Sequence, residues 1–419
     1  MNMDQPNEIF LQAADNIGAK LCRDALWAGP RCNWLGDSME VVGRVWQVAH
    51  RTFGPDLYSG TSGIALFLTR LFALTGERLF CTTAQGGLQH ALSKRDIFGP
   101  SARIGFYSGL TGIVYVLLEA GETFDNQSFT RKALQITEEL ARDDLSQQGL
   151  DVLSGCAGTI PVLLNIHRRY QKDHLIELAD RCGNRLLNTA RKTDYGWSWN
   201  TLDTPAELNR NDLTGFSHGA AGIAWALLEL HGKTGDEKYR KAATEAFRYE
   251  QHWFNSENGN WPDFRSLDGS ATGTDNAPGF MIAWCHGAAG IGLSRVRAFE
   301  LSRDSARRDE AEIAIKTTLD TLGQNNFSLC HGIGGNAELL IYASKILDKP
   351  DYRSIVDNIA EQAIEQYQKT NTPWPCGVLG GGETPNLMLG LAGIGHFYLR
   401  LFDASRTPSI LIITPDASE

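Results

Sequence analysis

The sequence has few of the features expected of a nucleic-acid-binding, membrane or disulfide-rich protein. Its 39 Lys and Arg are outnumbered by 49 Asp and Glu, which gives a formal net charge of −10. Phosphate binding requires clustered basic residues, so this balance argues against a nucleic-acid partner and favours a basic peptide. No run approaches the roughly 20 apolar residues of a membrane span. The acidic start MNMDQPNEIF is unlike a signal peptide, and we expect a cytoplasmic protein.

Cysteine is sparse, and the common nucleotide and hydrolase motifs are absent. Eight cysteines are spread over 419 residues, unlike the dense framework of a small secreted domain, so we expect them to be reduced. The chain contains no GxxxxGK[ST] phosphate loop, HExxH, GxSxG or dinucleotide-binding fingerprint. We therefore expect little use of ATP or nicotinamide.

A glycine-bearing motif recurs seven times along the chain. It reads YSGTSG, YSGLTG, LSGCAG, SHGAAG, CHGAAG, CHGIGG and LGLAG, and the steps between the first glycines are 45 to 68 residues. Such periods are typical of repeats that contain two helices each. The first glycines of the seven motifs are Gly60, Gly109, Gly155, Gly219, Gly287, Gly332 and Gly390.

Each motif is followed by an apolar run such as GIALFLTRLFAL, which predicts a buried helix. Amphipathic segments lie between these runs, at 129–142, 236–254, 309–322 and 351–368. One buried and one surface helix per repeat predict an all-α fold, an α/α toroid with seven inner and seven outer helices. We expect a single domain over 1–419, with an N-terminal helical extension at 1–40. Residues 405–419 are expected to form a poorly ordered tail, although SILII could fold back.

The seven motif loops should meet at one mouth of the toroid, where their glycines allow close backbone approach and positive φ. Motifs one, two and seven contain no acid, Cys or His, so we expect them to be purely structural. The longer segments 194–215 and 255–283 are expected to cover the mouth as ordered loops. Asp263 and Arg265 are candidates for an ion pair in the second of these loops, and for substrate contact.

Cys285, Cys330 and His331 occupy matching places in the fifth and sixth motifs, WCHGAAG and LCHGIGG. A lone cysteine is often a small buried hydrophobe, but thiolate and imidazole together suit zinc. Three protein ligands with an open fourth position are typical of a catalytic zinc site. We expect a substrate thiol in that position. Cys156 lies elsewhere in its motif and is interpreted as a core residue.

His218 stands one position before its motif glycine, in register with His286 and His331. A lone histidine is more often a hydrogen-bond partner, but this register predicts acid/base work at the mouth. Asp151 could orient such a histidine, or it could be a helix cap. His286 follows a predicted ligand. We favour a proton-transfer or outer-shell role for it, although it could also be a fourth ligand.

Together these blocks resemble the lanthionine synthetase C-like proteins, which include lanthipeptide cyclases and eukaryotic glutathione-binding relatives. The resemblance runs from about residue 40 to residue 410 and rests on DVLSGCAG, GFSHGAAGIA, WPDFR, WCHGAAGIGLSR, LCHGIGGNAELL and LMLGLAGIGHFYLRL. The last four blocks look most like the C-terminal cyclase half of class II LanM synthetases. LanM proteins also carry a long N-terminal dehydratase domain, and no segment here corresponds to it. We expect either a free-standing cyclase or a fragment of a larger synthetase.

The resemblance implies a toroid with Zn²⁺ on Cys285, Cys330 and His331, with Asp151 and His218 as the acid/base pair and His286 beside the metal. It implies Michael addition of a cysteine thiol to dehydroalanine or dehydrobutyrine in a dehydrated precursor peptide, with a separate dehydratase as an expected partner. Two alternatives stay open. One is addition of a small thiol such as glutathione. The other is a non-catalytic subunit with a closed zinc site, in which His286 or Cys376 is the fourth ligand.

Overall fold

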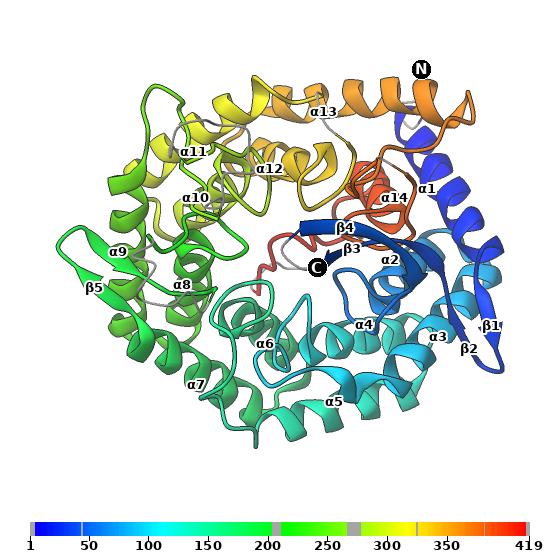
Figure 1. The fold of residues 1–419 in the computed structure, drawn as a ribbon, viewed down its shortest axis with the longest axis horizontal. Helices are drawn as coiled ribbons and strands as arrows, with labels where there is room; N and C mark the ends of the chain where they lie inside the picture. Colours follow the sequence, from blue (N-terminus) through cyan, green and yellow to red (C-terminus); the bar gives the residue numbers. More distant parts are fainter. Residues whose placement is uncertain are drawn as a thin grey trace.

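The computed structural model describes residues 5–42, 45–202, 211–265, 278–323, 326–380 and 382–415. Within them the chain forms fourteen α-helices and three two-stranded antiparallel sheets. The helices form two concentric rings (Figure 1), which confirms the predicted α/α toroid. Residues 203–210 and 266–277, which are parts of the predicted covering segments 194–215 and 255–283, and residues 416–419 at the end of the tail lie outside the described residues.

The inner ring consists of seven helices, each of which begins directly after the first glycine of a motif. In α4, for example, every residue from Leu110 to Leu118 is buried, as its apolar sequence predicts. Neighbouring inner helices contact one another around the ring, and α14 contacts α2 to close it. The inner helices are α2 (Thr61–Thr75), α4 (Leu110–Thr123), α6 (Cys156–Tyr170), α8 (Ala220–Thr234), α10 (Ala288–Ser302), α12 (Ile333–Ile346) and α14 (Leu391–Phe402).

The outer ring is amphipathic, and six of its helices pack on the inner helix that precedes them in sequence. In α5 the buried residues Phe129, Ala133, Ile136 and Leu140 recur at helical spacing, so one face covers the inner ring. The outer helices are α1 (Gln5–Arg23), α3 (Arg78–Ser93), α5 (Gln127–Leu140), α7 (Asp173–Thr189), α9 (Glu237–Trp253), α11 (Ser305–Leu319) and α13 (Pro350–Ala363).

The seventh pair joins the two ends of the chain, because α1 packs against α14. Helix α1 is therefore a full member of the outer ring rather than an extension, and the predicted helix within 1–40 covers only Gln5–Arg23. The rest of that region forms the hairpins β1 (Leu26–Ala28) with β2 (Arg31–Asn33) and β3 (Leu35–Val42) with β4 (Val45–Thr52). Gly29, with φ of 60°, and Pro30 form the two-residue turn between β1 and β2. Proline lacks a backbone N–H, so this turn is incompatible with a continuous helix over 1–40.

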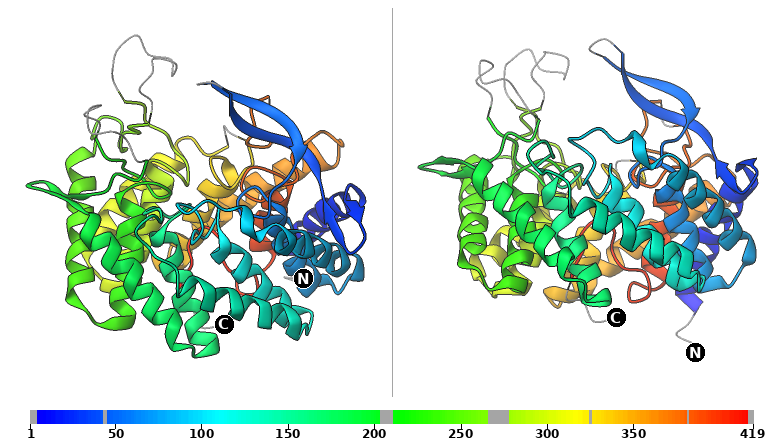
Figure 2. Two further views of the ribbon diagram at one scale, coloured as in Figure 1. Left: turned by 60° about the horizontal axis from the view of Figure 1, so that its bottom comes forward. Right: turned by 90° about the horizontal axis from the view of Figure 1, so that it is seen from below.

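The hairpin β3–β4 projects beyond the end of the toroid that carries the motif loops (Figure 2). The Thr384 hydroxyl, in the seventh motif loop, donates to the Asp37 carbonyl of β3 at 2.8 Å, which ties the hairpin to that end. A third small hairpin pairs β5 (Arg191–Thr193) with β6 (Gly196–Ser198), and its second strand lies in the first of the predicted covering segments, 194–215.

The chain after α14 turns back into the centre of the toroid (Figure 1). Ile410, Leu411, Ile412 and Ile413 are at most 4% exposed. The expectation of a poorly ordered tail from 405 was therefore wrong for the described residues, because these four apolar side chains gain more by filling the ring than by remaining in water.

The motif loops are joined by a closed ring of backbone hydrogen bonds. Two positions before the first glycine, each loop has a residue whose N–H donates to the carbonyl of the equivalent residue in the next loop, at 2.8 to 3.3 Å. The last loop donates to the first, so all seven repeats take part. In chain order the residues of this backbone ring are Tyr58, Tyr107, Leu153, Ser217, Cys285, Cys330 and Met388.

The second glycine of each motif is required by close packing. A β-carbon at Gly222, for example, would lie 2.0 Å from the carbonyl oxygen of Phe216, and the other six second glycines have the same kind of contact at 1.9 to 2.2 Å. The first glycines have extended backbones except for Gly287, whose φ is 79°. The predicted close approach of the backbone at the motif glycines is therefore confirmed. The predicted positive φ is found at the first glycine of the fifth motif only.

We predict that Gly222→Ala lowers the free energy of unfolding by about 2 kcal/mol or more, because the new methyl group overlaps the Phe216 carbonyl. Gly232→Ala in the same helix is the matched control. No atom lies within 4 Å of its added β-carbon, so it should raise stability by up to about 1 kcal/mol. Urea denaturation followed by circular dichroism measures both, and equal effects would contradict this role of Gly222.

Candidate functional site

Asp151 and His218 meet between the third and fourth motif loops. The Nδ1 atom of His218 lies 2.5 Å from Oδ2 of Asp151. Oδ1 of Asp151 accepts from the backbone N–H and the hydroxyl of Ser154, at 2.8 and 2.9 Å, which holds the carboxylate in place. The Asp151 side chain is 3% exposed and that of His218 is 20% exposed. A carboxylate that holds Nδ1 leaves Nε2 as the ring nitrogen that can exchange a proton.

His286 lies beside His218, with the two rings stacked at a centroid distance of 5.8 Å. Its side chain is buried, and neither ring nitrogen has a hydrogen-bond partner among the described residues. Burial, reinforced by the positive charge of Arg265, lowers the pKa of His286 to about 3. The imidazole is therefore neutral at physiological pH.

The thiols of Cys285 and Cys330 lie together, because their residues are neighbours in the backbone ring. The Cys285 thiol donates to the sulfur of Cys330, and this hydrogen bond lowers the pKa of Cys330 against the effect of burial. The same bond, together with burial, raises the pKa of Cys285. The Tyr58 hydroxyl is a second donor to Cys330. The two thiols therefore titrate as a coupled pair, and the first proton lost belongs to the pair.

Tyr58 is the site residue that the sequence reasoning missed, since it belongs to the first motif, which was interpreted as structural. It stands two positions before Gly60, as Cys285 and Cys330 stand before their own motif glycines. An alignment of the seven motifs on their first glycine places the three residues in register and would have found it.

Asp263 and Arg265 form the predicted ion pair. The Arg265 guanidinium bonds both carboxylate oxygens of Asp263, with Nε–Oδ1 at 3.0 Å and Nη2–Oδ2 at 2.7 Å. Burial raises the pKa of Asp263, but the hydrogen bond and charge of Arg265 outweigh it and the net shift is downward. The Arg265 charge also lowers the pKa of Cys285 and of Cys330. Arg265 thus brings positive charge to the thiols.

His331 lies in the sixth motif loop, one residue after Cys330. Its Nε2 is 3.0 Å from the carbonyl oxygen of Gly377. A carbonyl can only accept, so Nε2 carries the proton and Nδ1 of the neutral ring keeps its lone pair. That lone pair makes Nδ1 the atom of His331 that could bind a metal.

In the described part of the chain, no three His, Cys, Asp or Glu side chains converge closely enough to hold a metal ion. Two of the three predicted ligands, Cys285 and Cys330, do lie together, and His331 is close enough to Cys285 that its protonated form would lower the pKa of that thiol. Two thiols and an imidazole fit zinc by donor type, so zinc stays a prediction. Cys376, an alternative fourth ligand, lies instead against the carbonyl of Thr384, with its sulfur 4.0 Å away.

Glu250 of α9 supports the loop that carries His218, and the sequence provided no sign of this role. Its Oε1 accepts from the N–H groups of Gly215 and Ala221, on either side of His218, at 3.1 and 3.0 Å. Its Oε2 has no hydrogen-bond partner among the described residues, but it lies within ion-pair distance of Nη2 of Arg295, at 4.0 Å. Burial raises the pKa of Glu250 to about 7, although Arg295 and the two N–H groups oppose the shift.

A sequence model of the family described as "Lanthionine synthetase C-like protein" matches residues 52–412. The chain belongs to this family. Among described helices, none is both long and apolar enough to cross a membrane.

The chain is also similar to individual proteins with different names. Lacticin 481/lactococcin biosynthesis protein LcnDR2 of Lactococcus lactis subsp. lactis is 23% identical over 84% of this chain, which spans only 36% of LcnDR2. Nisin biosynthesis protein NisC of the same organism is 21% identical, covering 74% of this chain and 79% of NisC. Glutathione S-transferase LANCL1 of Danio rerio is 22% identical, covering 77% and 86%. The solved structure of nisin cyclase matches with a TM-score of 0.62 at 19% identity, over 84% of this chain and 90% of its own.

We predict that Glu250 makes the protein less stable as the pH rises from 5 to 8. The pKa of a glutamate is about 4.5 in the unfolded chain and about 7 here, so the folded state binds an extra proton between these values. That contribution, about 2 to 3 kcal/mol, is present at pH 5 and lost as the pH passes 7. Urea denaturation at both pH values should show a smaller decline for Glu250→Gln than for the parent. An identical decline in both proteins would contradict the shift.

Proposed function

We propose that this protein is a zinc-dependent lanthipeptide cyclase. It adds cysteine thiols of a dehydrated precursor peptide to dehydroalanine or dehydrobutyrine and so forms thioether rings. The observation that carries the proposal is the placement of an acid/base pair, Asp151–His218, and a thiol pair, Cys285–Cys330, in consecutive motif loops of one ring. The names of its relatives LcnDR2 and NisC support the substrate class. We place the reaction in the cytoplasm, where its eight free cysteines would stay reduced.

Cys285, Cys330 and Nδ1 of His331 are the atoms that would hold Zn²⁺. When bound there, the metal would supply a Lewis acid that lowers the pKa of a nearby substrate thiol. The Cys330 thiol already has a lowered pKa in this site, through Cys285, Tyr58 and Arg265. The surroundings therefore favour the deprotonated sulfur that a ligand must provide.

His218 is the group that moves protons in this proposal. Its Nε2 takes the proton of the substrate thiol, and Asp151 stabilises the imidazolium that results. The substrate sulfur then forms a bond to the β-carbon of the dehydro residue, and the electrons of the C=C bond move toward the adjacent carbonyl. His218 returns the proton to the α-carbon. The reaction needs no other reactant, since every atom of both partners stays in the product.

His286 and Arg265 set the electrostatics around that proton transfer. His286 is buried and neutral beside His218, so it does not compete for the proton, and its charged form would repel an imidazolium. Arg265 supplies a fixed positive charge near the thiols. Such a charge favours anionic sulfur, and in a site with little water its effect is strong.

The name of the relative LANCL1, a glutathione S-transferase, supports a second candidate function. The same thiol-activating groups would add glutathione to a dehydro residue or to another electrophile. The two functions differ in whether the attacking thiol belongs to the peptide.

We predict that the purified protein binds about one equivalent of zinc and closes rings. The assay uses synthetic peptides with one dehydroalanine and one cysteine, followed by alkylation of remaining thiols and mass spectrometry. Cys285→Ala should lose zinc and ring closure, whereas Cys376→Ala, which removes a buried thiol outside the pair, should keep both. Zinc without ring closure, but with incorporation of added glutathione, would favour the second function. Absence of zinc from the parent protein would overturn the zinc-dependent proposal.

We predict that His218→Gln lowers kcat at least about 100-fold, which is the usual contribution of a general acid/base. Asp151→Asn should cause a smaller loss, because His218 remains but its orientation and charge are no longer supported. His231→Gln, in the last turn of α8 and bonded to the Asp236 carbonyl, is the control and should leave the rate unchanged. Full activity of His218→Gln would contradict the acid/base role of His218.

A further inference from the structure

Segment 407–413 is held in the toroid by hydrogen bonds from surrounding side chains to its backbone carbonyls. Thr407 and Ile410 to Ile413 are buried, whereas Pro408 is exposed. Two buried arginines of the inner helices donate to its first carbonyls. Arg400 of α14 reaches Thr407 and Arg70 of α2 reaches Pro408, each at 2.8 Å. The inner-ring carboxylates Glu338 and Glu119 pair with these arginines and fix them.

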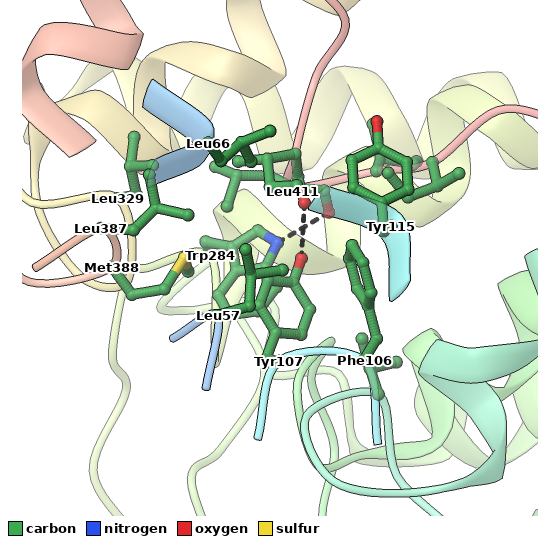
Figure 3. Close-up of a cluster of buried hydrophobic side chains, with 14 of the residues drawn as sticks. Leu57, Leu66, Phe106, Tyr107, Tyr115, Trp284, Leu329, Leu387, Met388 and Leu411 are labelled. Carbon is green, nitrogen blue, oxygen red and sulfur yellow. Dashed lines mark hydrogen bonds between the residues drawn. The ribbon is translucent and has the colours of Figure 1, made fainter. Parts of the chain in front are cut away.

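The other two donors come from the motif loops. The Tyr107 hydroxyl donates to the carbonyl of Ile410 at 2.7 Å, and Nε1 of Trp284 donates to the carbonyl of Leu411 at 3.0 Å. Figure 3 shows both bonds among the buried apolar side chains. The rings of Tyr107 and Trp284 also contact each other edge to face, with centroids 5.1 Å apart. The segment thus touches the loops at two points.

Both of these donors are directly linked to the thiol site. Tyr107 is a member of the backbone ring and accepts the N–H of Tyr58, the residue that bonds Cys330. Trp284 immediately precedes Cys285 and is fully buried. The indole ring of Trp284 is packed on all sides, so it has no free volume in which to rotate. A displacement of the ring is therefore passed to its own backbone and to that of Cys285, the next residue.

We propose that segment 407–413 positions the site, because it anchors Trp284 and thereby sets the position of the Cys285 thiol beside Cys330. The proposal builds on the proposed thiol site but not on the identity of the peptide substrate. Trp284 acts here as a positioning residue.

The first test is a chain that ends after Arg406, compared with one that ends after Pro415. Both are treated with a chelator, checked for helix content by circular dichroism, and alkylated with iodoacetamide at fixed pH, with mass spectrometry reporting on Cys285. We expect at least tenfold faster alkylation in the shorter chain, and a return toward the parental rate when a synthetic peptide of residues 404–415 is added. A folded shorter chain with the parental alkylation rate would overturn the proposal.

Point variants decide the case in which the shorter chain does not fold. Trp284→Phe removes the N–H that bonds Leu411 together with part of the buried ring, and the control must lose the same ring volume. Trp225→Phe is the matched control, since Trp225 is also buried but donates to Glu229 at 3.2 Å, away from the segment. Only Trp284→Phe should speed alkylation of Cys285, by at least threefold, and shift the thiolate-to-metal absorption of the protein loaded with Co²⁺. Equal behaviour of the two variants would overturn the proposal.

These readouts separate the positioning proposal from the proposed function. If the parent protein closes no rings but Trp284→Phe still alters Cys285 alkylation, the positioning role stands and the cyclase proposal fails. If rings close but Trp284→Phe and Trp225→Phe have identical thiol reactivity and cobalt spectra, the cyclase proposal stands and the positioning role fails.

Discussion

The closed ring of seven backbone hydrogen bonds is the constraint on which the site depends. Each loop must have its neighbour in place, because an unpaired buried N–H or carbonyl is costly. The ring puts residues of widely separated repeats into equivalent, adjacent positions. Cys285 and Cys330 become neighbours in this way, and Met388 meets Tyr58 where the two ends of the chain join. The second glycines let each motif loop pack against the helix that follows it. A larger residue at any of them would overlap a carbonyl of the loop and so disturb the backbone ring.

Burial affects the ionisable groups of the site in different ways, and their partners explain the differences. His286 has no hydrogen-bonded partner and is neutral. Asp263 is buried too, but the Arg265 guanidinium lowers its pKa. The interactions of Cys330 with Cys285, Tyr58 and Arg265 lower its pKa against the effect of burial. A site in which these protonation states are set in advance needs little rearrangement when charge develops in a reaction.

The sequence predicted the parts of the fold that depend on local patterns. Apolar runs after the glycines predicted the inner helices, and the register of Cys285 with Cys330 predicted that their thiols would meet. The N-terminal helix was misjudged because its partner, α14, lies at the other end of the chain. The role of Glu250 could not be predicted from local sequence, because its carboxylate accepts from N–H groups of a loop about 30 to 35 residues away in the chain. Tyr58 was not predicted as a site residue because its motif contains no acid, Cys or His.

By itself the sequence determined the repeat, the alternation of buried and amphipathic helices, and the register of the motif residues, because these follow from periodicity along the chain. Only the tertiary structure decided which repeats are neighbours, how α1 closes the outer ring and where the last residues lie. Segment 407–413 shows the reason. Its sequence is a short apolar stretch with no helical period. Its place is defined by Arg70, Tyr107, Trp284 and Arg400, which come from different repeats and donate to its carbonyls.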